Sequence, residues 1–155
     1  GLATLEFSGV TELVLAGGRT RVTSPARVED YLGDAYRFDP ANRTWARLPD
    51  LPHRSLLGAA LRLDATRLLV LGGSDAHDLA RMAELGERYR LPDHVQLFDS
   101  VGGRWSVAGT MPLGVVGGAV APAAHGWFIV GGEWSPGLRT PQVHCLRAPL
   151  PADAR

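Results

Sequence analysis

The sequence has no lysine, one cysteine, few aromatic residues and no excess of either charge. All 16 basic residues are arginines, and they are matched by 16 acidic residues, so the net charge is zero. A neutral chain lacks the basic surface that nucleic-acid-binding proteins use, so no nucleic-acid partner is expected. Cys145 alone cannot close an internal disulfide, and we expect it to be a small buried hydrophobic residue.

Long apolar segments are also missing. The most apolar stretch, residues 115–124, is interrupted by Gly117, Gly118 and Pro122 and is too short to span a membrane. Residues 1–6 show no basic region followed by an apolar core, so we expect no signal peptide within this chain.

Turn-forming residues are abundant instead. The 19 glycines and 11 prolines interrupt the sequence too often for long helices, while 45% of the residues are hydrophobic. This composition predicts an all-β domain with many turns and a packed core.

One repeated pattern organises the chain. Three apolar runs end in a Gly-Gly pair, at residues 13–18, 68–73 and 127–132. An aromatic–Asp pair precedes Trp45 and Trp105, which are 60 residues apart, and a proline follows each tryptophan seven positions later. Alternation and turn residues predict four short strands in each repeat, except that the third repeat lacks its fourth strand. The expected strands are residues 2–7, 12–16, 34–39, 44–48, 56–63, 67–71, 94–99, 104–108, 116–122, 126–130 and 141–147.

The repeat resembles the kelch repeats, which form the blades of β-propellers, and the resemblance covers essentially the whole chain. It implies an all-β fold: a partial kelch-type β-propeller of about three four-stranded antiparallel blades, the last one incomplete. The blades are expected at about residues 1–50, 51–110 and 111–150, with the tryptophans packed between neighbouring blades. Propellers close with about 4 to 8 blades, so these blades cannot form a ring alone. We expect them to be part of a six-bladed ring, completed by further blades or by a second copy.

The predicted topology gathers polar loops at one rim. In an antiparallel blade, the loop after the second strand and the link to the next blade leave from the same face. The concave mouth of a propeller channel suits a small ligand. Polar residues expected at this rim are Arg19, Arg21, Arg54, Asp75, His77, Glu133 and Arg139. The candidate substrate-binding residues among them are Arg54, Asp75, His77 and Arg19, with a solvated surface role as the alternative.

The loop after the third Gly-Gly pair, residues 131–140, is the most distinctive. It combines a carboxylate, Glu133, with a guanidinium, Arg139, in a turn stiffened by a proline and relaxed by a glycine. Its Gly-Glu and Pro-Gly-Leu-Arg-Thr strings resemble those of the sialic acid mutarotases, the N-acetylneuraminate epimerases of the kelch class. Trp134 and Ser135 depart from the small or basic residues expected there in that family.

Two further features extend this resemblance. Similar residues flank the loop, at residues 97–99, 104–109 and 117–120. The family also has a long insertion after a Gly-Gly pair, here residues 74–93. Apolar residues recur at helical spacing over residues 79–85, which predicts a short helix over the rim, with Ser74 or Asp75 as its cap.

The resemblance implies an isomerase that needs no cofactor and acts on a small sugar acid. The reaction would be mutarotation of N-acetylneuraminate from the α to the β anomer by ring opening. Glu133 would carry a proton in acid–base catalysis, and Arg139 would bind the substrate carboxylate through two hydrogen bonds, both side chains facing one sugar-sized hollow. The resemblance also implies a bacterial periplasmic or secreted location, with the cytoplasm left open.

Metal sites are not expected. His144 and Cys145 are adjacent on a predicted strand and therefore point to opposite faces. His53, His94 and His125 are isolated in the sequence and lack the partners that coordination or catalysis needs. Copper-radical oxidase chemistry, which some propellers perform, likewise lacks its ligands here.

A second function remains open at this stage: a non-catalytic kelch interaction module whose loops bind a protein partner or a glycan. An enzyme needs Glu133 and Arg139 to converge on a small pocket. A binding module should present an exposed apolar or aromatic surface, for example around Trp134.

Overall fold

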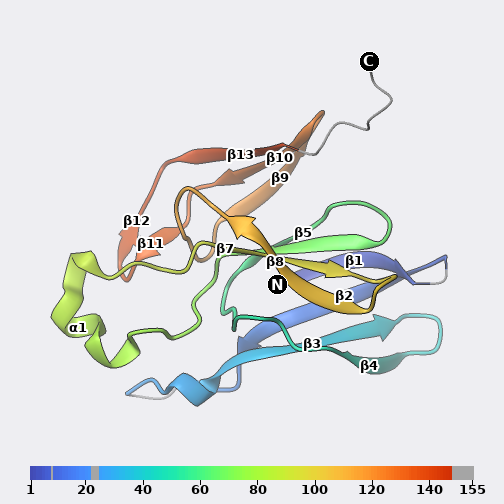
Figure 1. The fold of residues 1–155 in the computed structure, drawn as a ribbon, viewed down its shortest axis with the longest axis horizontal. Coiled ribbons are helices and arrows are strands. Elements are labelled where there is room, and N and C mark those ends of the chain that lie inside the picture. Colours follow the sequence, from blue (N-terminus) through green and yellow to red (C-terminus); the bar gives the residue numbers. More distant parts are fainter. Residues whose placement is uncertain (8, 22–24, 148–155) are drawn as a thin grey trace.

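The computed structural model describes residues 1–7, 9–21 and 25–147. Three antiparallel sheets of three or four strands, each with its strands in chain order, lie one beside the next (Figure 1). A fourth sheet has two strands, β11 (Glu133–Ser135) and β12 (Leu138–Arg139). No helix in this part of the chain is long and apolar enough to cross a membrane.

Each sheet corresponds to one predicted blade. The first contains β1 (Leu2–Phe7), β2 (Val10–Arg19), β3 (Tyr31–Asp39) and β4 (Thr44–Leu48). The second contains β5 (Ala59–Arg62), β6 (Arg67–Leu71), β7 (His94–Asp99) and β8 (Arg104–Thr110). The third contains β9 (Ala119–Ala123), β10 (Gly126–Val130) and β13 (Val143–Arg147). The all-β fold and the partial set of propeller blades are confirmed.

The blades pack through their faces. The first strands of consecutive sheets are neighbours, because β1 contacts β5 and β5 contacts β9. An apolar cluster between the first and second sheets contains Val14, Ala16, Ala35, Leu48, Leu51, Leu68, Val70, Phe98 and Trp105. A second cluster, which joins the second and third sheets, contains Leu61, Leu69, Leu71, Val95, Met111, Val115 and Ile129. Both clusters draw side chains from two sheets, so each blade is stabilised by burial against its neighbour.

Two predictions of burial are wrong for residues on the outward faces of the first and third sheets. Trp105 is 9% exposed and packs between blades as expected, whereas Trp45, its counterpart in the first sheet, is 56% exposed. Cys145 on β13 is exposed rather than buried. The reason is the same for both residues: no other sheet of the described part of the chain covers the face on which they lie.

The insertion of residues 74–93 forms three short helical turns, η2 (Leu79–Arg81), α1 (Met82–Leu85) and η3 (Gly86–Arg88). A helix is therefore present where it was predicted, but the prediction of its cap is wrong. Asp78, in a left-handed conformation with φ 49°, holds the cap position without a side-chain hydrogen bond. Asp75 accepts a hydrogen bond from the His77 backbone N–H instead, in a turn before the helix.

Tyr89 anchors the insertion. Its side chain is 2% exposed, and its hydroxyl donates a hydrogen bond to the backbone carbonyl of His77 at 2.9 Å.

A further helical turn, η1 (Val28–Asp30), precedes β3 in the first blade. Figure 1 shows α1 and η1 on the same side of the molecule, at the end of the sheets where the long loops lie.

The first two Gly-Gly pairs lie against the link that enters the next blade. Gly17 and Gly18 are within β2, at a shift in register, whereas Gly72 and Gly73 directly follow β6. Gly72 and Gly73 have φ values of 60° and 90°, which residues with a Cβ rarely adopt. A Cβ on Gly72 would lie 2.5 Å from the carbonyl oxygen of Val115, and the Gly73 N–H donates to that same oxygen at 3.0 Å. A Cβ on Gly17 would meet the carbonyl oxygen of Ser55 in the same way. Glycine therefore allows a close approach between the backbones of consecutive blades.

Gly72→Ala should lower the free energy of unfolding by about 2–5 kcal/mol, since the left-handed conformation and the clash with Val115 both carry a cost. Gly103→Ala is the matched control, because Gly103 has φ 62° and open space around it. It should cost only about 1–2 kcal/mol. Urea denaturation of both variants measures the difference. Equal losses in the free energy of unfolding would show that the contact with Val115 does not contribute to stability.

Candidate functional site

Two strands that the sequence did not predict form the loop of interest. β11 (Glu133–Ser135) and β12 (Leu138–Arg139) pair as a hairpin, with a turn that contains Gly137 at φ 78°. The register places Glu133 directly opposite Arg139. Residues opposite each other in an antiparallel ladder project to the same face, with Cβ atoms about 4.5–5.5 Å apart. The hairpin thus brings the predicted acid–base residue and the predicted carboxylate-binding residue together, Glu133 half-buried and Arg139 exposed.

The hairpin also contains a bulge. The register shifts between Glu133 and Ser135, so Trp134 is an extra residue on β11. Bulges redirect side chains and are frequent beside functional sites. Ser135 is completely buried, and its hydroxyl has no hydrogen-bond partner among the described residues.

Hydrogen bonds fix the hairpin to the third blade. The backbones of Glu133 and Val116 exchange two hydrogen bonds of 2.9 Å, and Val116 belongs to the link that enters this blade. Directly after β12, the Thr140 N–H donates to the carbonyl of Gly132 at 3.0 Å. The backbone at Glu133 is therefore fixed by hydrogen bonds to the link and across the hairpin.

The insertion of the second blade braces the same hairpin. The Leu91 N–H donates to the carbonyl of Trp134 at 3.3 Å. The Arg90 guanidinium lies 4.6 Å from the centre of the Trp134 ring, within the range of a cation–π interaction. Trp134 is partly buried against the apolar cluster between the second and third sheets. Two blades thus hold the hairpin in position.

Three of the arginines predicted at the rim contact residues of the first blade. Arg21 pairs with the buried Asp30 at 3.2 Å, and Arg54 donates to the carbonyl of Val28 at 3.0 Å. The Arg19 guanidinium lies 5.3 Å from the Tyr31 ring centre, and its Nε and one Nη are buried without a hydrogen-bond partner among the described residues. These observed contacts are structural, and a substrate-binding role of Arg19 and Arg54 stays a prediction.

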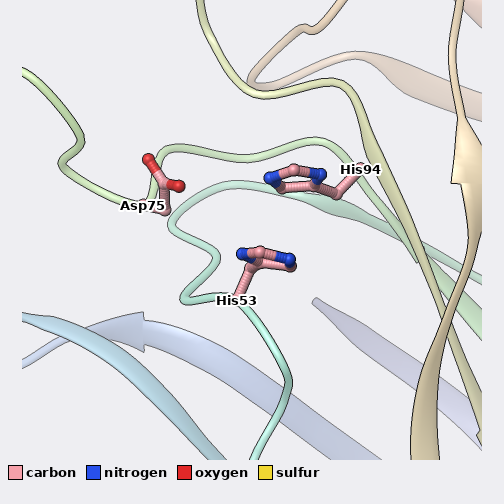
Figure 2. A group of neighbouring side chains, drawn as sticks. All are labelled: His53, Asp75 and His94. Carbon is pink, nitrogen blue, oxygen red and sulfur yellow. The ribbon is translucent and has the colours of Figure 1, made fainter.

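A cluster of histidines lies at the base of the insertion. The rings of His53 and His94 are stacked, with centroids 3.8 Å apart and an interplanar angle of 16°. Figure 2 shows that one ring nitrogen of each is on the side of Asp75. Asp75 Oδ1 lies 2.8 Å from His77 Nδ1, so two of the predicted binding residues are in contact. The expectation that His53 and His94 are isolated is wrong, because the topology brings their separate segments to one rim.

The environment of His53 alters its acidity. Burial lowers the pKa of His53, the positive form of His94 lowers it further, and the carboxylate of Asp75 partly raises it. The imidazole therefore stays neutral to a lower pH than an exposed histidine does.

A small hollow of about 80 Å³ lies elsewhere, on the first blade, and is lined by Glu12, Arg37, Asp39, Thr44 and Ala46. Pockets for small molecules usually measure about 300–1,000 Å³, so this hollow is too small for a nine-carbon sugar. The sugar-sized hollow between Glu133 and Arg139 stays a prediction.

Comparison with known proteins agrees with the fold and with the resemblance to the sialic acid mutarotases. No family model matches the chain. An N-acetylneuraminate epimerase of Yersinia pestis (strain Pestoides F) is 31% identical over 136 residues, which cover 72% of this chain and 35% of the relative. The enzymes of the same name from Haemophilus influenzae (strain PittEE) and Yersinia enterocolitica are 26% and 28% identical over 73% and 90% of this chain. The chain resembles the N-acetylneuraminate epimerases.

The chain spans 35–41% of the length of these epimerases. A solved structure described as "Structure of YjhT" matches 99% of this chain and 52% of that chain, with a TM-score of 0.69 and 19% sequence identity. At this identity the match shows the fold alone.

The histidine cluster is the part of the rim that sequence reasoning missed. His53 follows Pro52 in a link between blades, and His94 begins the third strand of its blade. The same topological rule that placed Arg54 and Asp75 at the rim applies to their neighbours. The positions of His53 and His94 in the repeat therefore contained the necessary information.

The pKa of His53 can be measured from the NMR titration of its ring, and the midpoint should lie below the usual value of about 6.5. Acidification through this range should favour unfolding, because the unfolded chain binds the proton more readily. His94→Gln should raise the midpoint without restoring it fully, because burial remains, and Asp75→Asn should lower it. His125→Gln, at an exposed turn, is the control and should leave it unchanged. A midpoint at or above the usual value would contradict the structure.

Proposed function

We propose that this chain supplies the catalytic loop of a mutarotase that converts the α anomer of N-acetylneuraminate to the β anomer. The observation that carries the proposal is the direct pairing of Glu133 with Arg139 on the β11–β12 hairpin. The relatives named N-acetylneuraminate epimerase support the choice of substrate. The activity is attributed to the complete propeller, of which these blades are a part.

Ring opening requires one proton to leave and one to arrive. The bond between the anomeric carbon and the ring oxygen breaks, the anomeric hydroxyl loses its proton and becomes a carbonyl, and the ring oxygen gains a proton. In the proposed mechanism the carboxylate of Glu133 accepts the first proton and returns it to the ring oxygen. After rotation about the bond to the anomeric carbon, the same oxygen attacks the opposite face, and the proton transfers run in reverse.

Arg139 would hold the substrate during this sequence. The sugar carries a carboxylate on its anomeric carbon, and a guanidinium can bind it through two parallel hydrogen bonds. Arg139 lies opposite Glu133 in the ladder, so a substrate anchored on the guanidinium would present its anomeric centre near the carboxylate. The brace from Arg90 and Leu91 would keep this geometry fixed.

The environment of Trp134 favours the enzyme over the alternative, a non-catalytic interaction module. A binding module should present an exposed aromatic surface. Trp134, the aromatic residue of the loop, instead packs on the apolar cluster and under Arg90. Of the two charged side chains that the chemistry requires, Arg139 is exposed and Glu133 is half-buried.

Glu133→Gln should slow the catalysed interconversion of the anomers by about 100-fold or more, since general acid–base catalysis typically contributes that much. NMR measures the approach of the pure α anomer to equilibrium with and without protein. Glu29→Gln, at an exposed residue of η1, is the matched control and should keep full activity. The proposal would be overturned by a parent protein that leaves the spontaneous rate unchanged.

Arg139→Ala should act mainly on substrate binding. Loss of a two-point, charge-assisted contact should raise KM by about 10- to 100-fold, with a smaller fall in kcat. The same NMR assay at varied substrate concentration separates the two constants. Arg104→Ala, which removes an exposed arginine of β8, should change neither. A KM unchanged in Arg139→Ala would remove this residue from the binding site.

A further inference from the structure

Three potential metal ligands converge at the base of the insertion. His53 lies in the link between the first and second blades, Asp75 follows the Gly-Gly pair of the second blade, and His94 begins β7. One ligand atom from each residue lies within 4.8 Å of the other two. Figure 2 shows the carboxylate beside the same edge of the two stacked rings.

Hydrogen bonds fix the backbone at or beside each of these residues. The His53 N–H donates to the Oε1 of Gln96 at 2.8 Å, and Gln96 is 1% exposed. Asp75 follows Ser74, whose backbone exchanges two hydrogen bonds with Leu56. The carbonyl of His94 accepts a hydrogen bond from the Gly72 N–H at 2.9 Å. The three side chains therefore project from backbones whose positions are already set, as a preorganised site requires.

The carboxylate itself is held by a fourth residue. Asp75 Oδ1 accepts the backbone N–H of His77 at 2.9 Å and lies 2.8 Å from His77 Nδ1. The His77 ring in turn stacks on Tyr89 at 5.2 Å. Carboxylates that bind metals are commonly oriented by such hydrogen bonds.

We propose that His53, His94 and Asp75 bind a divalent transition-metal ion, with Zn²⁺ as the probe for the site. Two imidazole nitrogens and one carboxylate oxygen are a donor set suited to zinc and its neighbours, and three protein ligands leave a position open for water or an anionic ligand. This inference does not depend on the proposed sugar reaction.

Binding requires a small adjustment of the rings. Zinc–ligand bonds of about 2.1 Å in tetrahedral geometry place the ligand atoms about 3.4 Å apart. The present separation of up to 4.8 Å can close by rotation of the two imidazoles about their side-chain bonds, which ends their parallel stacking. The backbone anchors remain in place during this change.

The site would clamp the insertion. Asp75 lies at the start of residues 74–93, His94 directly follows their end, and His53 belongs to the neighbouring link. A metal ion would therefore tie both ends of the insertion to the junction between the first two blades. The insertion also contacts the β11–β12 hairpin through Leu91, so the clamp would act at the base of the segment that braces the loop.

Isothermal titration of the protein with Zn²⁺ tests the proposal, in a Cys145→Ser background because the exposed thiol could compete for the metal. One ion should bind per chain. His53→Gln, His94→Gln and Asp75→Asn should each weaken binding by at least about tenfold, as loss of even an outer partner commonly does. His125→Gln is the matched control and should not change the affinity, because His125 lies in the exposed β9–β10 turn.

NMR of the histidine rings in the protein with all three ligands intact is a second test, which does not depend on whether the variants fold. Zn²⁺ should shift the resonances of His53 and His94 together and leave those of His125 in place. The proposal is overturned by the absence of saturable binding at one ion per chain, or by binding that persists in all three ligand variants. It is also overturned if Zn²⁺ moves His125 or His144 rather than His53 and His94. None of these outcomes depends on whether the protein acts on a sugar.

Discussion

The fold depends on a close backbone contact that repeats from blade to blade. In the first two blades, a glycine of the Gly-Gly pair lies against a carbonyl of the link that enters the next blade: Gly17 at Ser55 and Gly72 at Val115. A side chain in this position would separate the blades and open the apolar clusters between them. Arg19, Ser74 and Glu133 each directly follow a Gly-Gly pair and hold equivalent places in the repeats of the three blades.

The features of the fold that recur along the chain could be predicted from the sequence, because a repeat reports the same physical requirement several times. The eleven strands of the three sheets and the glycine turns belong to this group. The β11–β12 hairpin could not be predicted in this way, since it occurs in one blade and contains a bulge at Trp134. The exposure of Trp45 and Cys145 depends on which sheets are neighbours, which the local pattern does not contain.

The candidate site also combines a feature that the local sequence predicts with one that depends on the topology. Glu133 and Arg139 are six positions apart in one loop, and their proximity was accessible to local reasoning about a tight turn. The contact between His53, Asp75 and His94 joins three segments, and each histidine examined alone has no partner in the sequence. The topology predicts which segments meet at the rim. Considering the side chains of all these segments, including the links and the first residues of strands, would have placed the three residues together.

The way in which the hairpin is supported limits how it can be transferred to another protein. Its backbone is fixed by Val116 of its own blade, while Trp134 is held by Arg90 and Leu91 of the preceding blade. A loop transplanted as a continuous peptide would lose the second support and with it the fixed separation of its two charged side chains. The smallest portable unit of this structure is therefore the junction between two blades, and recombination between related propellers would keep the loop intact only at boundaries outside that junction.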